Sequence, residues 1–274
     1  MKKNIFTETV KKLIDIFFAP LKKSKTFLSY LFDHTLKDEM EKRSERGELF
    51  RHLHIHRSIR LAGKLKNRDF IILDIGGGIG ATAKIFRSAF PSCQIVIFEP
   101  IEENFNTITS VFSADSRTRV LKKAAGNENS SRQINVANRI TSSSILPLSA
   151  DSGSEVFNED NLGRSRLENI EIVRLDDVPL TATGEIGIMK IDVQGFELDV
   201  LKGAERTLER TDIIVLEVNN HEGYAGSAKY FEIDGFLREH DFTLYDILPS
   251  ILDNCKLKEW DVIYLNNTAR CVSE

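Results

Sequence analysis

The sequence predicts an α/β fold built on a mostly parallel sheet, and the stretch between residues 70 and 98 carries this prediction. An apolar segment of strand character, residues 70–75, runs directly into a glycine-rich turn at residues 76–80. A helical pattern follows, and then a second apolar strand at residues 94–98. Strand and helix patterns alternate from there onward, which is typical of the βαβ units of parallel sheets.

The remaining elements follow from the spacing of apolar residues. Strands are expected at residues 119–124, 186–192 and 212–218, and helices at residues 79–90, 102–112, 195–209 and 226–239. The end of the chain indicates two further strands, residues 242–247 and 260–265, joined by a loop. Residues 126–169 are rich in Ser, Asn, Arg and Gly, so we expect a substrate-side loop insertion there with one short strand at residues 132–136.

Length and composition are those of a globular protein with one large domain and an extension. Residues 1–69 hold 17 Lys and Arg against 9 Asp and Glu, whereas residues 70–274 hold 20 against 32. The sequence therefore predicts a basic helical extension followed by an acidic domain, and nucleic acid is not an expected partner. Three cysteines lie far apart without a C-x-x-C pair, so we expect neither a zinc site nor a disulfide framework.

The extension has an amphipathic pattern. Apolar residues recur every three or four positions in residues 4–18 and again in residues 27–32, and lysines surround both stripes. Two interpretations stay open for residues 4–32: they pack on the domain or on a second copy of the chain, or they lie on an anionic membrane surface. Charged residues interrupt the stripes, so we expect no signal peptide and no spanning helix. The expected location is the cytoplasm, with peripheral contact to the inner membrane face as an option.

The glycine-rich turn and the strand after it predict a nucleoside site. Glycines at positions 76, 78 and 80 let the backbone turn sharply and approach a ligand. Glu99 ends the next strand, 23 residues after Gly76, which is the spacing at which an acid can bind ribose hydroxyls. Because Gly76, Gly78 and Ala81 also fit the dinucleotide pattern, a nicotinamide-dependent oxidoreductase or epimerase stays open as an alternative.

Acidic side chains end four of the expected strands, and ligands of parallel sheets bind at these ends. The four acids are Asp74, Glu99, Asp192 and Glu217. Lys190 lies two residues before Asp192 in an apolar strand, so both side chains share a face and the lysine needs an anionic partner there. Either a shared functional site or a structural ion pair accounts for these residues.

Two groups of histidines differ in their expected roles. His221 follows the strand that ends at Glu217, so it lies at the ligand edge of the sheet and is a candidate base. A second group falls in a charged, helix-favouring segment, where its members would point apart: His52, His54 and His56. We expect these three to form a solvated helix face and not a metal site.

One segment adds a family resemblance. Ile188–Ala204 closely resembles the signature K-I-D-x-[QE]-G-x-E-x-x-x-L-x-G-A of the FkbM family of S-adenosylmethionine-dependent methyltransferases. Leu73–Gly80 is similar to the cofactor loop of that family, Phe98–Pro100 to its ribose-binding strand end, and Arg174–Val178 to its L-D-D/E element. The resemblance covers roughly residues 70–265 and leaves the first 69 residues outside.

The resemblance implies a class I methyltransferase (Rossmann-like) fold, with a seven-stranded sheet whose last strand is antiparallel. It implies S-adenosylmethionine as the cofactor and transfer of a methyl group to a hydroxyl of a sugar or a polyketide, and it points to surface glycan biosynthesis. Residues with implied cofactor contacts, by position in the family, are Asp74, Gly76, Gly78 and Gly80 at the methionine part, Glu99 at the ribose, and Ala124 and Ala125 at the adenine.

Our mechanistic hypothesis is that Asp192 or His221 orients and deprotonates the acceptor hydroxyl, while Glu217 supports it and Lys190 tunes the local field. No metal is predicted, although the carboxylates could instead hold a divalent ion. A non-catalytic binding module, tethered to a membrane by residues 1–32, is the alternative outside enzymes.

Overall fold

The computed structural model describes seven stretches of the chain: residues 52–65, 69–138, 142–149, 164–180, 184–220, 223–253 and 256–269. By contacts the chain divides into two units, residues 1–52 and 53–274, and the second is described here. The amphipathic stripes expected in residues 4–32 lie outside the described residues. Among the helices that are described, none combines the length and the apolar character needed to cross a bilayer.

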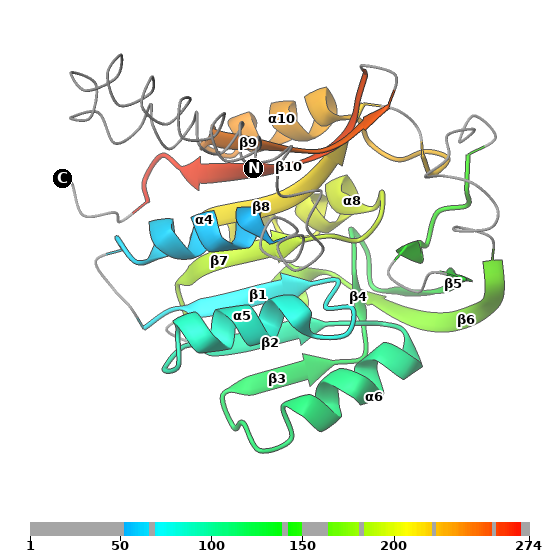
Figure 1. Ribbon diagram of the computed structural model, residues 1–274, viewed down its shortest axis with the longest axis horizontal. Helices are drawn as coiled ribbons and strands as arrows, with labels where there is room; N and C mark the ends of the chain where they lie inside the picture. The colour runs from blue at the N-terminus through cyan, green and yellow to red at the C-terminus, as the bar shows by residue number, and fades with distance from the viewer. Residues whose placement is uncertain are drawn as a thin grey trace, which may run out of the picture. The chain divides into compact units, whose positions relative to one another are not determined.

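A seven-stranded sheet forms the centre of the domain, with the order β3-β2-β1-β7-β8-β10-β9 (Figure 1). The strands are β1 (Ile71–Ile75), β2 (Gln94–Phe98), β3 (Thr118–Leu121), β7 (Ile186–Ile191), β8 (Thr211–Asn219), β9 (Phe242–Asp253) and β10 (Lys256–Asn266). Strands β3, β2, β1, β7 and β8 pair in parallel, whereas β10 runs antiparallel to β8 and to β9. The predicted α/β class and its mostly parallel sheet are confirmed.

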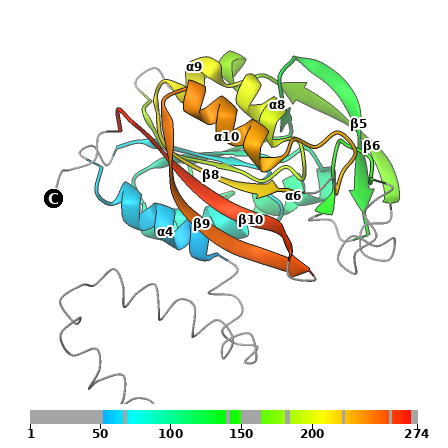
Figure 2. The same cartoon turned by 90° about the horizontal axis from the view of Figure 1, so that it is seen from above.

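Helices cover both faces of this sheet. They are α4 (Leu53–Ala62), α5 (Ala81–Ala89), α6 (Glu102–Val111), α8 (Glu197–Lys202), α9 (Glu205–Leu208) and α10 (Tyr230–Glu239). Figure 2 shows α8, α9 and α10 on one face and α4 with α6 on the other. Every residue of β1 and β7 is buried, as expected of parallel strands covered on both sides. Two of these buried residues, Asp74 and Lys190, are charged, and they mark the site described below.

Helix α4 belongs to this packing although the sequence analysis assigned its residues to the extension. Its buried residues include Ile55, Leu61 and Ala62, which join the core cluster between the sheet and α5. Arg57 of α4 also pairs with Asp246 of β9. A boundary at residue 69, as expected, would therefore separate α4 from the sheet on which it packs.

The region expected to be mainly loop, residues 126–169, instead contributes two long strands to a second sheet of order β4-β6-β5. Its strands are β4 (Ala124–Ala125), β5 (Ser130–Ala137) and β6 (Arg164–Val173). The strand expected at residues 132–136 is present within the longer β5, whereas β6 was not expected. The expectation of a continuous strand over 119–124 is wrong, because β3 pairs in the large sheet and β4 in the small one.

The single helix expected over residues 195–209 is two helices, α8 and α9. The carbonyl oxygen of Gly203 accepts a hydrogen bond from the Asp176 N–H at 3.1 Å, so it is used outside the helix. Gly203 also lies so close to the backbone of Gly126 that any Cβ at position 203 would collide with the Gly126 carbonyl oxygen. The chain therefore turns at Gly203 and starts a new helix.

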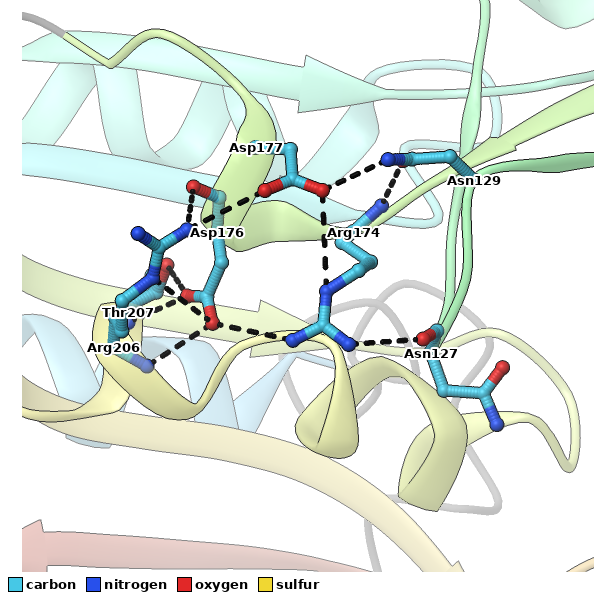
Figure 3. A network of polar contacts seen from close by, with 7 residues as sticks. All are labelled: Asn127, Asn129, Arg174, Asp176, Asp177, Arg206 and Thr207. Atoms are coloured by element: carbon cyan, nitrogen blue, oxygen red, sulfur yellow. Dashed lines mark hydrogen bonds and ion pairs between the residues drawn. The ribbon is translucent and has the colours of Figure 1, made fainter.

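Asp176 in the short helix η3 (Leu175–Asp177) caps that new helix (Figure 3). Its Oδ1 accepts hydrogen bonds from the backbone N–H and the hydroxyl of Thr207, both at 2.8 Å, and its Oδ2 accepts the N–H of Arg206 at 3.1 Å. Arg174 lies on the other side and donates to the carbonyl of Asn127 at 3.1 Å. This network joins η3, α9 and the turn after β4.

We expect Asp176→Ala to lower the free energy of unfolding by about 2–4 kcal/mol, because it leaves buried donors at the start of α9 without an acceptor. The Asp176 side chain is 1% exposed, whereas that of Asp177 is 44% exposed. Asp177→Ala is therefore the matched control, with an expected loss below about 1 kcal/mol. Urea unfolding followed by circular dichroism measures both, and equal losses would contradict the capping role.

Candidate active site

A solvent-open cavity lies at the carboxyl ends of β1, β2 and β7. These three strands run toward the small sheet (Figure 1). Its walls come from the glycine turn after β1, the end of β2, strands β4 and β5, the segment 142–149, and the loop between β7 and α8. The empty space within it, with its open mouth included, is about 920 Å³. This is the edge at which parallel sheets bind ligands.

The glycine turn has the shape that its sequence predicts. Gly76 has a φ of 80°, and an added Cβ would collide with the carbonyl oxygen of Asp192, so only glycine lets the turn pass β7. Gly78 has a φ of 54°, and an added Cβ would meet nothing within 4 Å, because the residue faces the open cavity. Gly80 precedes α5 as its N-cap and is not among the lining residues.

Glu99 lies in the cavity wall with its carboxylate fixed by the backbone. Its Oε2 accepts the Gly78 N–H at 2.8 Å and its Oε1 accepts the Ile101 N–H at 2.9 Å. The residue is 4% exposed, and this burial raises the pKa of the carboxyl to about 7, against the opposing effect of its hydrogen bonds. The side chain of Asn104 is a third hydrogen-bond donor to this carboxylate, so one of its four acceptor sites stays available to a ligand.

An apolar wall lies beside Glu99. Ala124 and Ala125 of β4 line the cavity, and the small side chains leave a flat surface. Ile101, Ile134 and Ile145 line it as well. The cavity therefore has an acid next to an apolar surface, which suits a ligand with vicinal hydroxyls and an aromatic base.

Lys190 connects three parts of the site. Its Nζ donates to the carbonyl of Gly76 at 2.8 Å and lies 3.3 Å from Asp74 Oδ1 and 3.4 Å from Asp192 Oδ2. Burial alone would lower the pKa of Lys190, but Asp192 and Asp74 outweigh it and raise the pKa. Lys190 is therefore a buried cation that holds the glycine turn to β7. Asp74 is fully buried behind the turn, where burial raises its pKa, and it is not among the lining residues.

Asp192 faces the cavity and is joined to Glu217 through Gln194. The Nε2 of Gln194 donates to Asp192 Oδ1 at 2.9 Å and to Glu217 Oε1 at 3.3 Å. Asp192 is also a lining residue with 41% of its side chain exposed. Its partial desolvation would raise its pKa, but the neighbouring Lys190 outweighs this effect and lowers it. Burial and the nearby Glu259 raise the pKa of Glu217. The structure thus brings Asp192 and Glu217 together, as predicted. Of these two acids, only Asp192 lines the cavity.

Sequence reasoning missed Gln194 and the residues that hold it. Gln194 has a φ of 56°, which a non-glycine residue rarely adopts. Its carbonyl accepts the Ser144 hydroxyl at 2.6 Å, and its Oε1 lies 3.1 Å from the hydroxyl of Tyr224. The only available signal was its place in the family signature, since Ser144 and Tyr224 lie 50 and 30 residues away.

Glu197, also in that signature, shapes the loop between β7 and α8. Its Oε1 accepts the N–H of Gly195 at 3.0 Å and that of Val193 at 3.2 Å. The side chain is buried, and this burial raises its pKa to about 7. Glu197 thus holds the backbone from which Asp192 and Gln194 reach the cavity.

The histidines differ from expectation. His54 does not lie on a solvated face: its Nδ1 is 2.9 Å from Asp261 Oδ2, and its side chain is 14% exposed. His56 is exposed as expected. The predicted base His221 lies outside the described residues. Within the part of the chain that is described, no group of three or more His, Cys, Asp or Glu residues is arranged to hold a metal ion.

The family described as the methyltransferase FkbM domain matches residues 66–244. The chain belongs to this family. Membership assigns the domain to the S-adenosylmethionine-dependent methyltransferases and decides against the nicotinamide-dependent alternative. The predicted family, enzyme class and cofactor are therefore confirmed.

Two curated relatives of this FkbM methyltransferase are similar at low identity. Hexuronic acid methyltransferase AglP from Haloferax volcanii is 26% identical over 161 residues, which cover 59% of this chain and 61% of that protein. The match thus spans less than two thirds of that relative. 2-O-methyltransferase NoeI from Sinorhizobium fredii is 29% identical over 178 residues, or 64% of this chain and 72% of that protein. Among solved structures, N-methyltransferase NodS from Bradyrhizobium japonicum has 8% identity, with 80% of this chain and 98% of that chain covered and a TM-score of 0.47.

The residues of this FkbM methyltransferase fit its cofactor on structural grounds. Glu99 keeps an acceptor site for a ribose hydroxyl, and Ala124 and Ala125 offer a small apolar surface for an adenine. An added Cβ at Gly78 would meet nothing within 4 Å, so a ligand can approach the backbone at this glycine. Asp192 adds a negative charge to the lining on the β7 side, which suits a sulfonium.

Proposed function

We propose that this FkbM methyltransferase transfers a methyl group to a hydroxyl of a sugar or a similar metabolite, with surface glycan biosynthesis as its setting. The observation that supports this most is that Glu99, after β2, and the part-exposed carboxylate of Asp192, after β7, line one cavity on either side of β1. The side of Glu99 suits an adenosine, and the side of Asp192 suits the acceptor hydroxyl. The names of the two relatives, a hexuronic acid methyltransferase and a 2-O-methyltransferase, agree with a sugar acceptor.

When bound, S-adenosylmethionine supplies a methyl group on a sulfonium. Asp192 stays a carboxylate at neutral pH because Lys190 lowers its pKa, so it accepts the hydrogen bond of the acceptor hydroxyl and orients its oxygen. Gln194 fixes Asp192 Oδ1 and is itself held by Glu217. A carboxylate of low pKa is a weak base. We therefore assign orientation to Asp192 and keep His221 as the proposed base that removes the proton.

The test measures cofactor binding and methyl transfer to the acceptor in separate experiments. We expect S-adenosylhomocysteine, but not NAD, to bind the full chain in calorimetric titration, and labelled methyl groups to pass from S-adenosylmethionine to hydroxyls in a panel of glycans, as read by mass spectrometry. Asp192→Asn should lower turnover about 10- to 100-fold, because a charge-assisted hydrogen bond is lost, with little change in S-adenosylhomocysteine affinity. Asp177→Asn, an exposed acid outside the cavity, is the control. Full turnover in Asp192→Asn would remove this residue from the mechanism.

The role of residues 4–32 stays a prediction. Their pattern fits packing or self-association, and it also fits peripheral contact with an anionic membrane. Membrane contact would place the enzyme at the inner membrane face. Flotation of full-length and truncated protein with anionic vesicles distinguishes them. The same experiment addresses the non-catalytic tether considered above.

A further inference from the structure

The buried face of α6 carries a polar residue where the helix meets the cavity. Asn104 is 3% exposed and lines the cavity, whereas Ile108, four residues later on the same face, is a residue of the apolar core. Asparagine is a poor helix former, and it is rarely buried unless its amide has hydrogen-bonding partners. The first turn of α6 thus places a carboxamide in the cavity wall at a position where an apolar residue would pack as well.

Asn104 contacts the acid to which the ribose is assigned. Its side chain is a hydrogen-bond donor to the carboxylate of Glu99. Within the described part of the chain, no other group forms a hydrogen bond with this side chain. A carboxamide has two N–H donors and a carbonyl oxygen that accepts. One N–H and the carbonyl oxygen of Asn104 are therefore left for a molecule in the cavity.

Glu99 by itself cannot accept from both hydroxyls of a ribose. Gly78 and Ile101 donate to its carboxylate at 2.8 and 2.9 Å, and Asn104 donates as well, which leaves one acceptor site. The two hydroxyls of a ribose stand on adjacent carbon atoms, so the second comes close to the groups that surround Glu99. Gly78 and Ile101 each use their single N–H on Glu99, whereas Asn104 keeps polar atoms for the ligand.

We propose that Asn104 binds the second hydroxyl of the cofactor ribose, so that two side chains, Glu99 and Asn104, recognise the diol. The inference rests on the adenosine lying at Glu99, as in the proposed function, and the acceptor does not enter it. A hydroxyl donates and accepts, which matches the free carbonyl oxygen and N–H of the carboxamide. A cofactor without this hydroxyl binds more weakly, because it leaves a buried amide without its partner.

The test combines changes in the ligand with a change at Asn104. S-adenosylhomocysteine and its 2′-deoxy and 3′-deoxy analogues are titrated calorimetrically into the full chain and into Asn104→Leu, since leucine has a similar shape and no hydrogen-bonding group. In the wild type, we expect both analogues to bind more weakly, by about 3- to 10-fold for the one that lacks the hydroxyl at Asn104. In Asn104→Leu, that analogue should bind at least as tightly as S-adenosylhomocysteine, whereas the other should keep its loss.

Two further variants assign the effect. Asn106→Leu, at an exposed position of the same helix, is the matched control and should leave all three affinities unchanged. Asn104→Ala should reproduce the pattern of Asn104→Leu and serves if leucine prevents folding. The proposal is overturned if both analogues lose as much affinity in the Asn104 variants as in the wild type.

The same titrations distinguish this inference from the placement on which it rests. If Glu99→Gln binds S-adenosylhomocysteine as tightly as the wild type does, the ribose does not lie at Glu99 and the placement fails. If Glu99→Gln binds more weakly and neither analogue responds to the change at Asn104, only this inference fails.

Discussion

Lys190→Met is expected to lower the free energy of unfolding by about 3–5 kcal/mol at pH 8, because it leaves a fully buried carboxylate, Asp74, without its cation. Methionine fills a similar volume, so the loss reports charge and not a cavity. The substitution also removes the hydrogen bond from Nζ to the Gly76 carbonyl, so the glycine turn should bind S-adenosylhomocysteine more weakly. Lys84→Met, at an exposed position on α5, is the matched control and should change stability by less than about 0.5 kcal/mol.

The pH dependence of this loss has a defined sign. Without Lys190, burial raises the pKa of Asp74 further above its value in the unfolded chain, so the folded variant binds a proton that the unfolded chain releases. Stability of the variant relative to wild type should therefore recover as the pH falls from 8 toward 5. The double variant Lys190→Met/Asp74→Asn should recover part of the loss at pH 8. Chemical unfolding at several pH values measures this, and a deficit that stays constant with pH would contradict the ion pair as its cause.

Glu99→Gln is expected to weaken S-adenosylhomocysteine binding about 10- to 100-fold. Gly78, Ile101 and Asn104 donate to this carboxylate, and the acceptor site that they leave can take a ribose hydroxyl in a charge-assisted hydrogen bond worth about 1.5–3 kcal/mol. An amide presents one oxygen and an NH₂ group, so it cannot accept on both sides. Glu102→Gln, an exposed acid at the start of α6, is the control, and calorimetric titration reads both.

Affinity in the wild type should also depend on pH near neutrality. Since burial raises the pKa of Glu99 to about 7, the free protein is protonated there at lower pH, and a ligand that needs the carboxylate must displace this proton. Affinity should be greatest above pH 8 and should fall through pH 7 toward pH 6 by up to about tenfold per unit. The Glu99→Gln variant should lack this dependence. A wild-type profile as flat as that of the variant would show that Glu99 does not hold the ribose.

The part of the cavity wall formed by the glycine turn and Glu99 was predictable because its parts are close in sequence. The turn that contains Gly78 and the acid Glu99 lie on consecutive strands, and their sequence pattern gave both the backbone shape and the acid. The central strands were predictable as well, since β1 and β7 are apolar runs with a single charged residue each. Local pattern and final contact agree in this half of the domain.

The rest depended on contacts between distant residues. Strand β6 begins with a polar stretch, Arg164–Asn169, and only its pairing with β5 makes it a strand. His54 was expected to be solvated because its own segment is charged, yet a residue more than 200 positions later, Asp261, contacts it. Gln194 adopts its unusual backbone because Ser144 and Tyr224 hold it. No local pattern encodes such contacts.

The lining of the cavity comes from separate parts of the polypeptide: the glycine turn, Glu99 and Ala124–Ala125 fall within residues 75–125, and Ile134 and Ile145 lie beside them, whereas Asp192 and Gln194 follow β7. Under the proposed function, divergence at Asp192 and Gln194 can alter which molecule is modified while the residues proposed to hold the donor stay the same. One donor-binding half can in this way serve many acceptors over evolutionary time, and a change of substrate requires few compensating changes elsewhere in the chain.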